Sequence, residues 1–132
     1  AKIKFPNHVI CGFDNVHKFE DPTSKNLPKV VINEKKDLVY ISRSLIPGEK
    51  KVSNRTYLKQ VCIYAFSKKE LDKFSSLKKK SKLEHAEDIE ILRFFELNTK
   101  IKMIKLNSNS IAVDEIKDVA KAERLLNQKS KK

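Results

Sequence analysis

Two apolar runs of the sequence carry polar side chains that could bind a ligand or a metal ion. The first run, residues 58–66, contains the amide of Gln60 and the phenol of Tyr64. The second run, residues 111–113, ends at the carboxylate of Asp114. Such runs are typical of buried strands, and α/β proteins build their binding sites at the ends of such strands. These three side chains are therefore the first candidates for a site.

Asp114 has two roles that the pattern alone leaves open. It stands between an apolar run and a helical pattern, so it could cap that helix by accepting hydrogen bonds from free backbone N–H groups. It could instead bind Mg²⁺, because this hard cation prefers oxygen ligands and commonly uses one or two carboxylates together with phosphate oxygens.

Acidic residues are concentrated in a segment that is predicted to be one long helix, from Ser81 to about residue 98. Ser81 and Glu84 have the spacing of a capping box, and the apolar face of the helix is formed by Ile91, Phe94 and Phe95. Glu84 and Glu87 continue this face toward the N-terminus, where they could face a cavity. The alternative is that both acids only serve the helix start, Glu84 as the capping partner and Glu87 by complementing the helix dipole.

The segments that carry these residues alternate between strand and helix patterns. The pattern predicts an α/β fold, a mixed sheet with flanking helices, in a single domain or fragment over residues 1–132. Residues 29–33 and 38–42 should form a hairpin, and residues 100–106 should form a strand with one exposed side. Further strands are expected at 8–13, 60–66 and 111–113, and helices after Ser67, Ser81 and Asp114.

The net charge of +12, from 29 Lys and Arg against 17 Asp and Glu, favours anionic partners. One alternative function is therefore a basic nucleic-acid-binding module. The lysines are dispersed, however, without an arginine cluster or interleaved aromatic residues, which argues against nucleic acid and for a solvated lysine-rich surface.

Other features exclude further classes of protein. No apolar run is long enough to span a membrane and no signal-peptide pattern opens the sequence, so no membrane partner and a cytoplasmic location are expected. Cys11 and Cys62 both lie in apolar runs and are expected to be buried and reduced. A disulfide bond between them is the alternative. The two glycines, Gly12 and Gly48, do not form a phosphate-binding loop.

Five consecutive segments resemble the motifs of one enzyme family. The order and spacing of these segments across residues 28–126 are similar to those of 3-deoxy-manno-octulosonate cytidylyltransferases, also called CMP-Kdo synthetases. The segments are residues 29–33, 38–47, 60–66, 83–93 and 112–118.

The resemblance implies the C-terminal portion of a nucleotide-sugar cytidylyltransferase fold, which transfers CMP from CTP to an acidic 2-keto-3-deoxy sugar with Mg²⁺ as the cofactor. It implies that Asp114 is a magnesium ligand, that Tyr64 contacts the sugar, and that Glu90, together with Glu87, is a sugar-contacting acid. Gln60 stands where better-known members carry histidine; glutamine can bond to a sugar but cannot change charge. No catalytic residue is assigned.

The family's triphosphate loop, its cytosine pocket and its other magnesium aspartate have no counterpart in this sequence. The N-terminal, nucleotide-binding half is therefore expected to be absent, and the chain is expected to be the sugar-binding and dimerisation half, inactive alone. Such a half should associate as a homodimer or with a partner chain, because unpaired strand edges and apolar patches tend to pair. A further alternative is a scaffold fragment that only mediates dimerisation.

Overall fold

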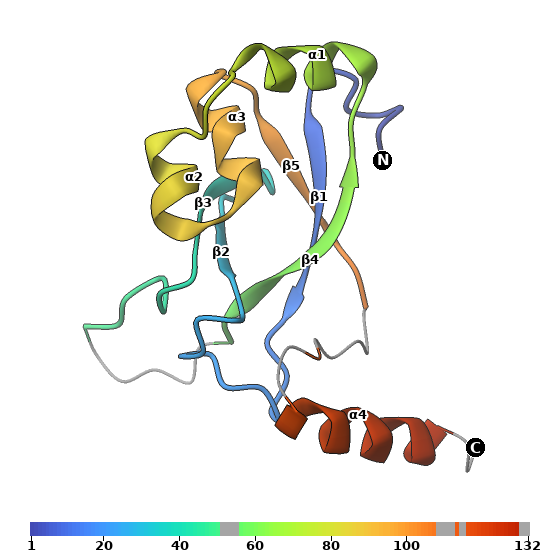
Figure 1. The fold of residues 1–132 in the computed structure, drawn as a ribbon. Coiled ribbons are helices and arrows are strands. Elements are labelled where there is room, and N and C mark those ends of the chain that lie inside the picture. Colours follow the sequence, from blue (N-terminus) through green and yellow to red (C-terminus); the bar gives the residue numbers. More distant parts are fainter. Residues whose placement is uncertain (51–55, 108–112, 114–115, 130–132) are drawn as a thin grey trace.

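The computed structural model describes residues 1–50, 56–107, 113 and 116–129. Its described strands form a five-stranded mixed sheet in the order β3-β2-β4-β1-β5 (Figure 1). The predicted α/β class with flanking helices is confirmed. The strands are β1 (Val9–Asn15), β2 (Lys29–Ile32), β3 (Leu38–Ser42), β4 (Leu58–Ala65) and β5 (Ile101–Lys105).

The sheet combines a hairpin with a crossover. β2 and β3 pair antiparallel, which confirms the predicted hairpin, and β1 pairs antiparallel with β4 and parallel with β5. The chain between β4 and β5 carries α1 (Lys68–Ser76), α2 (Lys82–Glu87), the 3₁₀ turn η1 (Glu90–Leu92) and α3 (Arg93–Glu96). The main hydrophobic core forms where this crossover packs on the sheet. Leu92 and Phe94 of the crossover are buried in this core.

Capping boxes begin the helices that were expected after Ser67 and Ser81. Ser67 Oγ accepts the backbone N–H of Glu70 at 3.4 Å, and Glu70 accepts the N–H of Ser67 at 2.6 Å. Ser81 and Glu84 exchange the same pair of bonds at 3.2 and 3.1 Å. Because each box satisfies backbone N–H groups that have no partner inside the helix, local sequence alone fixes where α1 and α2 begin.

The prediction of one helix from Ser81 to about residue 98 is wrong. Asp88 has left-handed backbone angles (φ 52°, ψ 49°) and ends α2, and the chain continues as η1 and α3. The guanidinium of Arg43 donates to the carbonyls of Glu87 and Asp88, at 2.7 and 3.1 Å. In a continuous helix, each of those carbonyls would accept a hydrogen bond from the backbone N–H four residues later. The contact with Arg43 therefore replaces hydrogen bonds of the helix.

A two-residue bulge interrupts β4. Cys11 lies opposite Tyr64, whereas the next residue, Gly12, lies opposite Val61, so Cys62 and Ile63 have no opposite residue on β1. Cys62 is exposed, which corrects the expectation that both cysteines are buried. Cys11 is buried, and both thiols are free, as expected. A bulge re-aims the side chains beside it.

The expected exposed side of the strand at 100–106 is only partly present. Lys102 is 7% exposed, because its ammonium donates to the carbonyl of Lys35 at 2.8 Å and forms an ion pair with Asp37. Residues 111–112 of the expected short strand and Asp114 lie outside the described residues, and Val113 is exposed and not in a strand. The last helix, α4, spans Ile116–Lys129. No helix in the described residues has both the length and the apolar character needed to cross a membrane.

Candidate functional site

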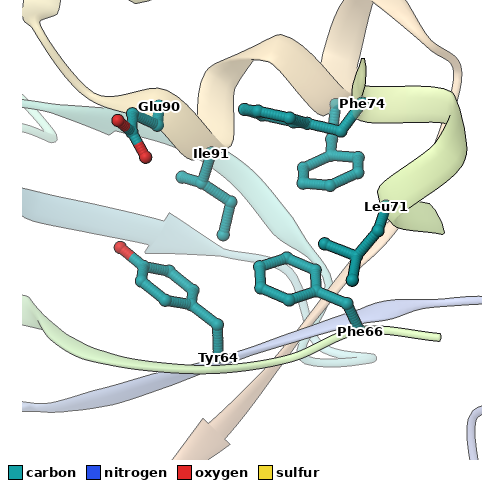
Figure 2. A pocket seen from close by; sticks show the side chains of 7 residues that line it. Tyr64, Phe66, Leu71, Phe74, Glu90 and Ile91 are labelled. Carbon is teal, nitrogen blue, oxygen red and sulfur yellow. The ribbon is translucent and has the colours of Figure 1, made fainter. Parts of the chain in front are cut away.

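A pocket of about 210 Å³ lies between the end of β4 and the crossover helices. Figure 2 shows its walls, which come from segments far apart in the sequence. β4 and the residue after it supply one wall, α1 another, and η1 with α3 the third. The lining residues are Tyr64, Phe66, Leu71, Phe74, Glu90, Ile91 and Phe94.

Most of the lining is aromatic. The ring of Phe66 stacks on Tyr64 and on Phe94, with centroids 5.8 and 5.7 Å apart, and Phe74 lies 5.3 Å from Phe94. The guanidinium of Arg93 lies 3.9 Å from the centroid of Phe74. Stacked rings of this kind form a rigid apolar wall, because each ring restricts the rotation of its neighbour.

Two polar side chains interrupt this apolar lining, Tyr64 and Glu90. Burial raises the pKa of Tyr64, and the nearby thiols of Cys62 and Cys11 and the carboxylate of Glu90 raise it further. The phenol therefore keeps its proton at neutral pH and can donate it, while the carboxyl oxygens of Glu90 can accept. An apolar pocket with a few placed polar groups is the usual form of a small-molecule site.

Gln60 stands behind Tyr64. Its Nε2 donates to Tyr64 Oη at 2.7 Å and approaches Cys11 Sγ at 3.8 Å. Burial raises the pKa of the Cys11 thiol to about 12. The bulge explains how Gln60 reaches a residue four positions away: Gln60 lies opposite Phe13 and Tyr64 opposite Cys11, so the two side chains occupy neighbouring positions on one face.

Glu87 does not line the pocket. Its carboxylate accepts hydrogen bonds from Ser42 Oγ at 2.6 Å, from the backbone N–H of Arg43 at 2.9 Å and from Tyr40 Oη at 3.3 Å. Burial acts to raise the pKa of Glu87, but these donors outweigh it and hold the pKa below its usual value. Glu87 thus ties the end of α2 to β3, and its expected contact with a sugar stays a prediction.

Asp114, the expected magnesium ligand, lies outside the described residues. Within the part of the chain that the structure describes, no three His, Cys, Asp or Glu side chains gather in a way that could hold a metal ion. The structure thus brings Gln60, Tyr64 and Glu90 together, and the role of Asp114 as a magnesium ligand stays a prediction.

The aromatic wall of the pocket is not predicted from the sequence. Leu71 and Phe74 have the spacing of an apolar stripe on a helix, and such a stripe usually packs in an ordinary hydrophobic core. Leu71 is 46% exposed, however, since the pocket lies where that stripe meets Phe66. Whether this stripe of α1 lines a pocket or packs in a core depends on how α1 lies relative to η1, which is a property of the folded chain.

Comparison with known proteins gives one consistent result. A family model described as cytidylyltransferase matches residues 4–101. The chain is 39% identical over 108 residues to the 3-deoxy-manno-octulosonate cytidylyltransferase of Christiangramia forsetii, which covers 81% of this chain and 43% of that protein. The enzyme of the same name from Flavobacterium johnsoniae is 35% identical over 108 residues, covering 81% of this chain and 44% of that protein.

The fold gives the same answer. A solved structure of CMP:2-keto-3-deoxy-manno-octonic acid synthetase complexed with CTP superposes with a TM-score of 0.81 at 29% identity, over 97% of this chain and 53% of that chain. The chain thus spans less than half the length of these two curated relatives. The matched segment includes the strands and the crossover that build the pocket, and the chain belongs to the cytidylyltransferase family.

Proposed function

We propose that this chain is the sugar-binding part of a cytidylyltransferase that transfers CMP from CTP to an acidic 2-keto-3-deoxy sugar. The observation that carries the proposal is the pocket in which the polar ends of Tyr64 and Glu90 interrupt an apolar, largely aromatic lining. The similarity to 3-deoxy-manno-octulosonate cytidylyltransferases names the class of sugar.

The chemistry proposed for this part is binding and orientation. The aromatic wall excludes water and covers an apolar face of the sugar, while Tyr64 donates to one sugar oxygen and Glu90 accepts from a hydroxyl group. Holding the sugar in one orientation lets its hydroxyl oxygen attack the α-phosphorus of CTP in line, so that the new P–O bond forms as the bond to the β-phosphate breaks, diphosphate leaves and the hydroxyl proton passes to solvent. Mg²⁺, when bound, would neutralise phosphate charge, and Asp114 is the residue proposed to hold it.

Turnover should require a CTP-binding part, because the sequence has no glycine-rich triphosphate loop. The chain alone should therefore bind no CTP. The proposal is tested by adding the N-terminal half of a relative and measuring CMP transfer to 2-keto-3-deoxy-manno-octonate. A complemented pair that is inactive toward every 2-keto-3-deoxy sugar acid would contradict the proposal.

Binding tests the pocket separately from turnover. Tyr64→Phe and Glu90→Gln should each weaken the binding of 2-keto-3-deoxy-manno-octonate by about tenfold, the effect of losing roughly one hydrogen bond. Tyr57→Phe is the matched control, because the hydroxyl of Tyr57 bonds to Glu49 and Tyr57 does not line the pocket. Equal affinities for all three variants would remove Tyr64 and Glu90 from the proposed site.

Self-association is also part of the proposal. Large apolar side chains that are half or more exposed occur on separate elements of the described chain, among them Val39 on β3, Ile63 in the bulge of β4 and Leu126 on α4. Exposed apolar side chains of this size favour pairing with a second copy or a partner chain. Sedimentation velocity should show a dimer that Ile63→Glu weakens; a monomer at all concentrations would count against the homodimer.

A cytoplasmic location and a single domain stay predictions.

The alternative of a nucleic-acid-binding module is not favoured by the family match. The structure also explains part of the basic charge internally, since three lysines are buried and held by the protein. Lys29 donates to the carbonyls of Ser24 and Arg43, and Lys59 pairs with Glu20 at 2.6 Å. Lys102, the third, pairs with Asp37. These charges stabilise loops and do not form a surface for phosphates.

A further inference from the structure

We propose that Gln60 is a positioning residue, which fixes the hydroxyl group of Tyr64 as a hydrogen-bond donor directed into the pocket. The identity of the ligand rests on the proposed function, whereas the direction of the hydrogen bond is a property of the chain alone. The expected role of Gln60 changes accordingly, from contacting the sugar itself to acting through Tyr64.

The N–H groups of Gln60 are already used. A glutamine side chain has two N–H donors and one carbonyl acceptor. One donor is 2.7 Å from Tyr64 Oη, and the same nitrogen lies 3.8 Å from Cys11 Sγ, within reach of a weak bond to sulfur. Gln60 is only 8% exposed, so a ligand in the pocket has little access to it. No N–H of Gln60 is left to bind the sugar.

The bond from Gln60 determines what Tyr64 can do. A phenol has one proton, and the oxygen of Tyr64 accepts from Gln60, so its own O–H can donate only to a third group. That group is either the side chain of Cys62, with which Tyr64 shares a hydrogen bond and whose sulfur is a weak acceptor, or an oxygen of a ligand that replaces it. Tyr64 is 40% exposed and lines the pocket, and Figure 2 shows its oxygen on the side where the carboxylate of Glu90 lies. The pocket therefore presents a donor from Tyr64 near an acceptor from Glu90.

The donor of Tyr64 and the acceptor of Glu90 together favour one end of a sugar acid over the other. A hydroxyl group both donates and accepts, so it can satisfy Tyr64 and Glu90 together. None of the described residues that line the pocket is cationic, and a sugar carboxylate would be repelled by Glu90. The hydroxylated end of the sugar should therefore enter the pocket, with its carboxylate directed outward.

Substitutions at Gln60 test the direction of the bond through binding of 2-keto-3-deoxy-manno-octonate. Gln60→Met keeps the size but removes the donor, and it should weaken binding by several-fold, up to about tenfold. In the double variant with Tyr64→Phe, no further loss should follow, because both changes remove the same interaction. Losses that simply add would overturn the proposal, since Gln60 would then contact the sugar independently.

Gln60→Glu supplies a pH-dependent readout. Once ionised, the introduced carboxyl can only accept, so the Tyr64 O–H donates its hydrogen bond to that carboxylate and is no longer available as a donor in the pocket. Binding should be weak at pH 8 and recover as the pH falls and that carboxyl is protonated, relative to the unchanged chain at each pH. The titratable groups around this position are Cys11 and Tyr64, which contact Gln60, and Cys62 and Glu90, which act on Tyr64. A variant that follows the unchanged chain at every pH would overturn the proposal.

A spectroscopic measurement decides the assignment without any sugar. The side-chain amide protons of Gln60, observed by NMR in the ligand-free chain, should shift on Tyr64→Phe and stay unchanged on Tyr57→Phe. If they do not respond to Tyr64→Phe, the positioning role is wrong. Failure of the unchanged chain to bind the sugar acid would instead contradict the proposed function, and the amide result would still stand.

Discussion

Arg43 and Glu87 bond to each other in both directions. The carboxylate of Glu87 accepts the backbone N–H of Arg43 at 2.9 Å, and the guanidinium of Arg43 donates to the backbone carbonyl of Glu87 at 2.7 Å. This pair joins the end of β3 to the end of α2 and directs the chain into the turn that leads to Glu90. The position of Glu90 in the pocket therefore depends on a contact made on the other side of the turn.

Arg43→Lys should lower the free energy of unfolding by about 1–3 kcal/mol, because an ammonium cannot match the planar array of donors with which Arg43 bonds to three carbonyls. Urea denaturation measures the change. Arg124→Lys, at an exposed position of α4, is the control and should stay within about 0.5 kcal/mol. Equal midpoints for the two variants would show that the turn does not depend on the guanidinium.

Glu84→Ala should destabilise the chain by about 3–5 kcal/mol, because Arg93 would lose its partner in a buried pair. Both oxygens of Glu84 accept from Arg93, at 2.7 and 2.6 Å, and the Glu84 side chain is fully buried. The measurement is again the denaturation midpoint. Glu34→Ala, at an exposed position, serves as the reference and should change stability by less than about 0.5 kcal/mol.

Stability should fall in acid. Hydrogen bonds from Arg93 lower the pKa of Glu84 against the effect of burial, below the usual value of 4.5. A carboxyl whose pKa is lower in the folded state stabilises the fold above its unfolded pKa and loses that effect as the pH falls through the folded value. Denaturation between pH 7 and 3 should therefore show a decline that begins near pH 5. Glu84→Gln should make this decline shallower; an unchanged slope would contradict the assignment.

Gly12→Ala should destabilise the chain by about 1–3 kcal/mol, because the added Cβ would lie 2.6 Å from Leu106 Cδ1 and 3.1 Å from the carbonyl oxygen of Val61. Shortening the flexible neighbour should restore part of the loss, so the double variant with Leu106→Ala should lose less than the two single changes together. Gly48→Ala is the matched control, since no atom lies within 4 Å of its added Cβ. Thermal unfolding of the four variants checks the prediction, and equal effects at both glycines would contradict it.

Features that depend only on neighbouring residues are encoded in the local sequence. Both helix starts followed from capping boxes at Ser67 and Ser81, and the hairpin followed from two β-branched runs with a short connection. The motif order also led to the right family, because it reflects positions along one chain. Local hydrogen bonds and side-chain periodicity are properties of the sequence, so they can be predicted from it.

The places where the regular patterns stop depend on contacts between residues that are far apart in the sequence. Nothing near Asp88 in the sequence ends a helix, and the break follows from Arg43, more than forty positions away, which takes the carbonyls that the helix would have used. Nothing near Cys62 marks a bulge, yet its register against β1 exposes Cys62 and brings Gln60 to Tyr64. These features depend on groups that meet only when the chain has folded, so a pattern read along the sequence does not contain them.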